Sequence, residues 1–204
     1  MLRTKAKAMA RDYQQLFGDL ARDYQITLVA GSIVLPEPRI ERGRLEVGRG
    51  PLYNVSLVFD QAGNPLGQPQ RHAFSAGALT TETTGAVQVL ETPAGRLGVL
   101  LGGDMQQLRQ ATTAGDETIE LLAMPSDLDS QADDAEFGDQ LQTHGIRAGL
   151  KVHLRGRLWE RSGQSQALAF DAGRSERGAS ERGAQLINLW PVSYTHLRAH
   201  ETKA

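Results

Sequence analysis

The segment from Thr92 to Asp104 constrains the fold most strongly, because it combines a turn, an apolar run and an abrupt end. It opens with Thr-Pro-Ala-Gly, continues through Leu-Gly-Val-Leu-Leu and closes with Gly-Gly-Asp. A short apolar run bounded by turn residues is typical of a strand that is buried on both faces. Together with residues 87–91, the segment predicts a hairpin whose second strand, residues 96–101, ends at a strand-to-helix corner.

Helical and strand patterns alternate along the rest of the chain, which indicates an α/β fold. Apolar residues at steps of three and four from Met9 to Tyr24 predict an amphipathic helix over residues 5–23. Apolar or alternating runs predict strands at 26–30, 52–59, 118–124, 148–155, 165–171 and 184–190, with a return segment around Leu66. Short helices are expected at 105–113 and, after the acidic stretch 127–139, up to about residue 144. Residues 36–50 and 173–183 are rich in Gly, Arg and Pro or Ser, and they are expected to be loops.

Composition excludes several classes of function. The chain has 204 residues and a net charge of -2, so it offers no overall basic surface for a nucleic acid. No apolar run approaches the roughly 20 residues that a membrane span needs. The absence of cysteine excludes disulfides, thiolate metal sites and thiol nucleophiles. We therefore expect a cytoplasmic protein without a metal or cofactor, and without nucleic-acid or membrane partners.

The last twelve residues fit no pattern upstream. Residues 193–204 resemble translated sequencing-adapter read-through and are set aside as a non-native tail. Residues 1–192 are then expected to form a single domain, because that length supports one α/β core and does not require two.

Five strings of the sequence, in order and spacing, resemble those of the nitrilase, or carbon–nitrogen hydrolase, superfamily. They lie at residues 26–32, 53–59, 92–104, 124–126 and 163–173. The resemblance implies an α-β-β-α sandwich, with two mixed sheets packed between helices. In this chain the sandwich would be shortened at the N-terminus by about one β-α-β unit. The resemblance also implies an ancestral amide or nitrile substrate and a helix-mediated homodimer.

The three catalytic groups of that superfamily are a nucleophilic cysteine, a lysine that stabilises negative charge and a glutamate base. In the register of the resemblance, the cysteine position is Gly102 and the lysine position is His72, with Arg71 beside it. We identify Glu82 as the only candidate for an auxiliary glutamate. The pair Pro36–Glu37 is rejected as the catalytic Pro-Glu, because it follows the strand at 26–30 instead of preceding the first helix.

The resemblance therefore predicts a carbon–nitrogen hydrolase relative that is catalytically inactive, either a pseudoenzyme or an incomplete gene fragment. Two alternatives stay open. One is a residual amide hydrolase in which His72 and Asp104 activate a water. The other is a non-catalytic dimerisation or binding module, which an apolar patch near residues 105–113 would favour.

Several other groups of residues are interpreted as structural. His72 is expected to be an ordinary, partly exposed histidine, and Asp104 an N-cap. His144 and His153 lie too far apart to form a local metal pair. The acidic residues of 127–136 are expected to be a solvated helix start. A basic strip on or beside a strand is expected to be an exposed strand face, with anion binding as the alternative: Arg147, Lys151, Arg155, Arg157 and Arg161.

Overall fold

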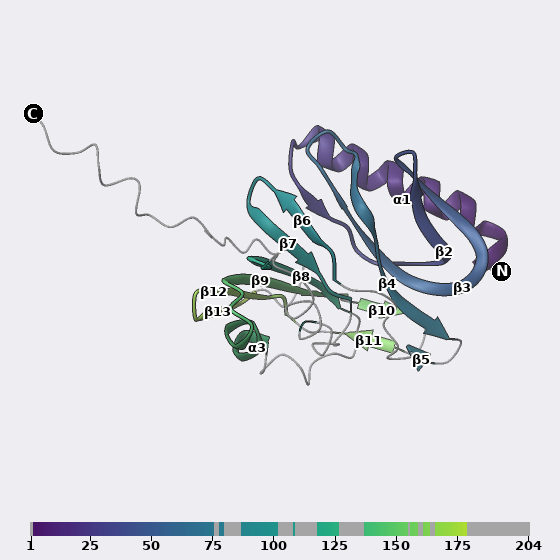
Figure 1. Cartoon of the computed structure of the whole chain (residues 1–204). Coiled ribbons are helices and arrows are strands. Elements are labelled where there is room, and N and C mark those ends of the chain that lie inside the picture. The colour runs from purple at the N-terminus through teal and green to yellow at the C-terminus, as the bar shows by residue number, and fades with distance from the viewer. Residues whose placement is uncertain are drawn as a thin grey trace, which may run out of the picture.

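In the described part of the chain, two helices enclose two large β-sheets in a four-layered sandwich (Figure 1). The computed structural model describes residues 2–75, 78–79, 87–101, 108, 118–126, 137–154, 156–158, 161–163 and 166–178. Helix α1 (Leu2–Asp23) covers the first sheet, and helix α3 (Phe137–Thr143) covers the second. The predicted α-β-β-α architecture is thus confirmed.

The first sheet is built by the N-terminal part of the chain. Its strands follow the order β1-β3-β4-β5, and β2 also pairs with β3. The bounds are β1 (Leu28–Val29), β2 (Ile33–Glu41), β3 (Arg44–Phe59), β4 (Pro65–Ser75) and β5 (Ala78–Leu79). The strand predicted at 26–30 is real but shorter, and the return segment around Leu66 is the start of an eleven-residue strand.

Helix α1 packs on this sheet mainly through small residues. Ala6, Ala10 and Ala21 are buried together with Tyr13, whereas the predicted stripe members Leu16 and Tyr24 are exposed. The buried side chains of α1 meet those of β3, whose alternate residues Val55, Leu57 and Phe59 face the helix. Alanine side chains let the helix backbone approach the sheet closely. The helix was therefore predicted correctly, but the face that it buries was predicted only in part.

The expectation of a loop at residues 36–50 is wrong, because this region forms the hairpin of β2 and β3. Glu41 pairs with Arg44 across the two-residue turn at Arg42 and Gly43, whose φ angles of 49° and 76° are those of the favoured hairpin turns. Proline at 36 and 38 is tolerated because β2 is an edge strand, and because the register shifts between these two prolines. The Gly, Pro and Arg content therefore marks a bulged edge hairpin and not a solvated loop.

The second sheet is built by the C-terminal half, in the order β13-β12-β9-β8-β7-β6. The predicted hairpin is confirmed as β6 (Val89–Thr92) and β7 (Gly95–Val99). The other strands are β8 (Leu121–Ser126), β9 (Ala148–His153), β12 (Leu168–Asp171) and β13 (Arg174–Arg177). A separate hairpin joins β10 (Gly156–Leu158) to β11 (Arg161–Gly163).

Two boundaries in this half differ from the prediction. Residues 174–177 form strand β13, although 173–183 was expected to be a loop; all four are exposed, so no apolar pattern marks the strand. Strand β8 also continues through Pro125 instead of ending there. The predicted helix at 105–113 lies outside the described residues apart from Leu108, as do the strand at 184–190 and the tail at 193–204. The limits of the domain stay a prediction.

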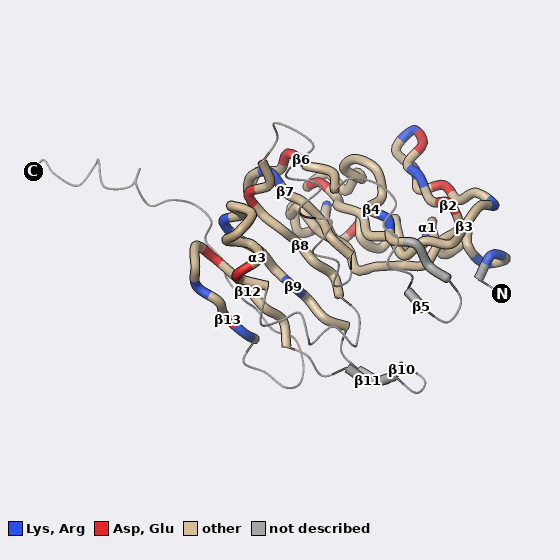
Figure 2. The backbone as a smooth tube through the Cα atoms, turned by 60° about the horizontal axis from the view of Figure 1, so that its bottom comes forward, with Lys and Arg blue, Asp and Glu red and all other residues tan. Residues whose placement is uncertain are grey.

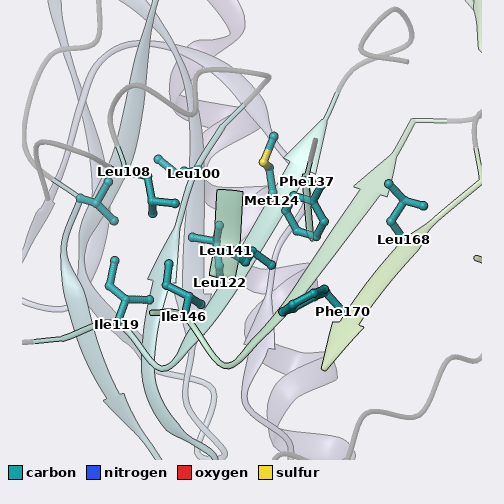
Figure 3. Close-up of a cluster of buried hydrophobic side chains, with 11 residues drawn as sticks. Leu100, Leu108, Ile119, Leu122, Met124, Phe137, Leu141, Ile146, Leu168 and Phe170 are labelled. Carbon is teal, nitrogen blue, oxygen red and sulfur yellow. The ribbon is translucent and has the colours of Figure 1, made fainter. Parts of the chain in front are cut away.

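The main core of the second half lies between its sheet and α3. Figure 3 shows that side chains from the strands and the helix point toward one another in this core. Its members come from segments that are far apart in sequence: Val87, Leu100, Leu108, Ile119, Leu122, Met124, Phe137, Leu141, Ile146, Leu168 and Phe170. A smaller cluster joins the two sheets, where Val58 of β3 packs with Leu97 and Val99 of β7.

The crossing of α1 over the turn after β3 generates the first prediction. A Cβ atom at Gly18 would lie 2.8 Å from the backbone oxygen of Gly63, whereas one at Gly31 would meet nothing within 4 Å. Gly18→Ala should therefore lower the free energy of unfolding by about 1–3 kcal/mol, despite the higher helix propensity of alanine. Gly31→Ala is the matched control. Urea unfolding of both variants measures the effect, and a stabilised Gly18→Ala variant would contradict this packing.

Tyr13 generates a pH prediction. Its hydroxyl donates to the Gly31 carbonyl at 2.7 Å, and burial raises its pKa above the ordinary value of 10.0. The unfolded chain therefore loses this proton first, so the stability contributed by Tyr13 falls as the pH rises through 10. Tyr13→Phe should be less stable than wild type at pH 8, and the gap should shrink by about 1.4 kcal/mol at pH 11. Urea unfolding at both pH values tests this, and a constant gap would be the contrary result.

Candidate functional site

Three parallel strands bring their carboxyl ends to one edge of the second sheet. Strand β7 pairs in parallel with β8, and β8 pairs in parallel with β9. Such an edge is where α/β proteins place their ligand sites. Leu101, just after β7, is buried and is followed in sequence by Gly102. The strand leading to the predicted nucleophile position is thus confirmed, whereas Gly102, Asp104 and Glu82 lie outside the described residues.

His72 is buried between the sheets and not partly exposed as expected. It lies on β4 opposite Asn54 of β3, and Gln70 lies opposite Ser56. Because side chains alternate along a strand, His72 shares the face of Ser56 and Val58, which is turned toward the second sheet. Its exposure is 5%, and neither Nδ1 nor Nε2 has a hydrogen-bond partner. A buried imidazole without a hydrogen bond is unusual in native structures and costs free energy.

Arg71 cannot take the place of the superfamily lysine. It neighbours His72 on β4, so its side chain leaves the opposite face of the strand. Its guanidinium carbon lies 5.5 Å from the centre of the Tyr53 ring. A cation over an aromatic face is a favourable contact in its own right, and it keeps the charge of Arg71 on the α1 side of the sheet.

The rejected pair Pro36–Glu37 has a structural role. Glu37 lies at the register shift of β2, with φ of 41°, and its carboxylate accepts a hydrogen bond from the Gly50 amide at 3.0 Å. A Cβ atom at Gly48 or Gly50 would collide with this carboxylate. Glu37 therefore stabilises the bulge of the hairpin.

The burial of Lys151 was not expected from the sequence. Lys151 was assigned to an exposed basic strip, but its side chain is completely buried, while Arg147 is exposed. Arg155 lies outside the described residues, as do the side chains of Arg157 and Arg161. Alternation over 149–154 shows that β9 has one apolar and one polar face, but it does not show which face is inside.

Metal binding finds no support in the part of the chain that the structure describes. There, no group of three His, Cys, Asp or Glu side chains is arranged to hold an ion. His153 is buried and His144 is half-buried, and both have interactions within the protein. The acidic residues of 127–136 lie outside the described ranges. No described helix is both long enough and apolar enough to cross a membrane.

Comparison by sequence gives no match to a family model or to a curated protein. Solved structures nevertheless share the fold. The carbon–nitrogen hydrolase of Helicobacter pylori G27 matches with a TM-score of 0.67 at 18% identity, covering 90% of this chain and 67% of that one. A cysteine-to-serine variant of the Nesterenkonia AN1 amidase, from the nitrilase superfamily, matches with a TM-score of 0.62 at 17% identity, covering 83% and 64%.

Two further structures of the Nesterenkonia amidase describe its chemistry. A cysteine-to-alanine variant in complex with butyramide has a TM-score of 0.63 at 16% identity, covering 83% of this chain and 63% of that one. Another variant carries the acetamide moiety of fluoroacetamide on its active-site cysteine. The chain spans 63–65% of the length of the first such structures. These comparisons confirm the resemblance at the level of the fold, which is that of nitrilase-superfamily amidases.

The buried imidazole of His72 generates a stability prediction. An unpaired polar group in a protein interior costs about 1–3 kcal/mol, which an apolar side chain of similar size avoids. His72→Leu should therefore be more stable than wild type, with a free energy of unfolding that is higher by about 1 kcal/mol. His72→Gln keeps a polar group at the site and is the control without this gain. A loss above about 1 kcal/mol in His72→Leu, measured in urea, would show that the imidazole is bonded after all.

Proposed function

We propose that this chain is a nitrilase-fold protein that does not carry out thiol-dependent hydrolysis of carbon–nitrogen bonds. The observation that carries the proposal is the absence of cysteine from all 204 residues. A thiolate is nucleophilic at neutral pH, and the related amidase forms its covalent adduct on a cysteine. Glycine at position 102 has no side chain with which to attack a carbonyl or nitrile carbon.

The other two catalytic roles support the same proposal. His72 stands at the superfamily lysine position, buried and without a hydrogen bond from either ring nitrogen. Glu37 is bonded to the Gly50 amide in the first-sheet hairpin. Catalytic groups that act as a unit lose most of their effect together, so replacement of the cysteine by Gly102 and of the lysine by His72 leaves little rate enhancement.

A small amide or nitrile remains the ligand class that the fold favours. The Nesterenkonia amidase binds butyramide, and this chain retains the parallel strands β7, β8 and β9 that form the carboxyl edge. We propose that any such ligand is bound without turnover. The homodimer and the cytoplasmic location suggested by the sequence belong to this proposal as well.

Hydrolysis assays test the proposal directly. The full chain, incubated with butyramide, acetamide and a simple aliphatic nitrile, should release no ammonia above the buffer blank. The double variant Gly102→Cys/His72→Lys restores two of the three group types, and it should stay inactive or gain only weak activity without the base. Circular dichroism confirms that each variant is folded.

A water-based mechanism predicts the opposite outcome. If His72 and Asp104 activated a water, the wild-type chain would release ammonia, and His72→Ala would abolish that release. Turnover with this dependence would overturn the proposal. Turnover that survives His72→Ala would equally overturn it and would point to other residues.

A further inference from the structure

We propose that Ser126, Lys151 and His153 form a binding site for a short aliphatic carboxylate at the carboxyl edge of the second sheet. Ser126 ends β8, and it lies opposite His153 of the parallel strand β9. Met124 lies opposite Lys151 in the same register. Because side chains alternate, all four point to one face of the sheet, the face that packs on α3.

The burial pattern of β9 is the reverse of what hydrophobicity favours. Lys151 is 0% exposed and His153 is 6% exposed, whereas Val152 and Leu154 are each 54% exposed. A register slip of one residue would exchange the two faces of a strand. Lys151 lies within β9, whereas Figure 2 shows blue and red segments gathered at turns and strand ends of this sheet. A strand that buries polar side chains and exposes apolar ones loses hydrophobic stabilisation. Such exceptions are expected at functional sites.

The hydroxyl of Ser126 is a second observation that favours a ligand, and it is independent of the burial pattern of β9. Its side chain is buried, at 8% exposure, and its Oγ has no hydrogen-bond partner. Its backbone carbonyl accepts a hydrogen bond from the Leu154 amide at 3.0 Å. A buried hydroxyl without a partner costs free energy, and a ligand that accepts its hydrogen bond would remove that cost.

The chemistry of the three side chains favours an acceptor. An ammonium group has three donors and no acceptor, and a serine hydroxyl and an imidazole can each donate as well. Lys151 and His153 already have interactions within the protein, so the ligand would add to these. Among the described residues of β8, β9 and β12 on this face, none is acidic. A carboxylate, which only accepts, matches these donors.

The neighbours of Lys151 define the rest of the ligand. Met124 lies beside it on β8, and Leu168 lies beside it on β12. Both are buried and apolar. Apolar side chains on both neighbouring strands suit the alkyl chain of a short carboxylate better than they suit a phosphate or a sugar acid. This inference does not rest on the proposed function, because it holds whether or not the chain hydrolyses amides.

Calorimetric titration of the full chain with butyrate tests the site. Saturable binding is expected, and chloride at equal ionic strength should give none. The neutral analogue butyramide should bind at least tenfold more weakly at this site. Lys151→Met should weaken butyrate binding at least tenfold, and Ser126→Ala should weaken it several-fold. Lys7→Met removes an exposed lysine of α1 and should leave the affinity unchanged.

The design separates loss of the site from loss of the fold. Replacing a buried charge by an apolar side chain of similar length is often tolerated, so Lys151→Met should fold, and thermal unfolding checks this. Should it fail to fold, Ser126→Ala removes a single oxygen atom and decides the question. Absence of butyrate binding to the wild-type chain, or unchanged affinity in Lys151→Met or Ser126→Ala, would overturn the proposal. Butyramide binding as tight as that of butyrate, and equally weakened by Lys151→Met, would overturn it too.

Discussion

The fold depends on the contact between the two sheets, where Val58 of β3 packs with Leu97 and Val99 of β7. This cluster joins the half of the chain that carries α1 to the half that carries α3. Each sheet buries its other face against its own helix. The apolar side chains between the sheets therefore hold the two halves of the sandwich face to face. The same contact fixes the second sheet, and therefore the carboxyl edge of β7, β8 and β9, against the His72 face of the first.

Hydrophobic patterning predicted the elements whose apolar residues are unambiguous. Helix α1, the hairpin of β6 and β7, and the strand that precedes Gly102 follow from spacing and turn residues alone. The bulged β2–β3 hairpin was not predicted, because prolines and glycines usually mark loops. In this chain they lie in an edge strand and at its register shift. Strand β13 was missed because four exposed polar residues carry no period. Backbone pairing with a neighbour decides such strands, and a single sequence does not display it.

The strand that leads to the candidate site was predictable, but the environment of the site residues was less so. The sequence register placed Gly102 after a buried strand, and β7 is such a strand, paired in parallel with β8. Gly102 itself lies outside the described residues. The burial of His72 and Lys151 could not be predicted, because it depends on which strand face the second layer covers. For β9, periodicity shows two distinct faces, and only the pairing with β8 shows that the polar one is inside. The ring nitrogens of His72 have no hydrogen-bond partner in this interior, whereas Lys151 has interactions within the protein.

The central claim is that no side chain of this protein forms an acyl or imidate intermediate with an amide or nitrile. Intact-protein mass spectrometry after prolonged incubation with fluoroacetamide and with an aliphatic nitrile measures this directly. The unmodified mass should persist at every time point, because the sequence offers no thiol to the electrophile. A stable mass increase that corresponds to one covalently bound substrate, and that maps to a single residue of the carboxyl edge, would contradict the claim.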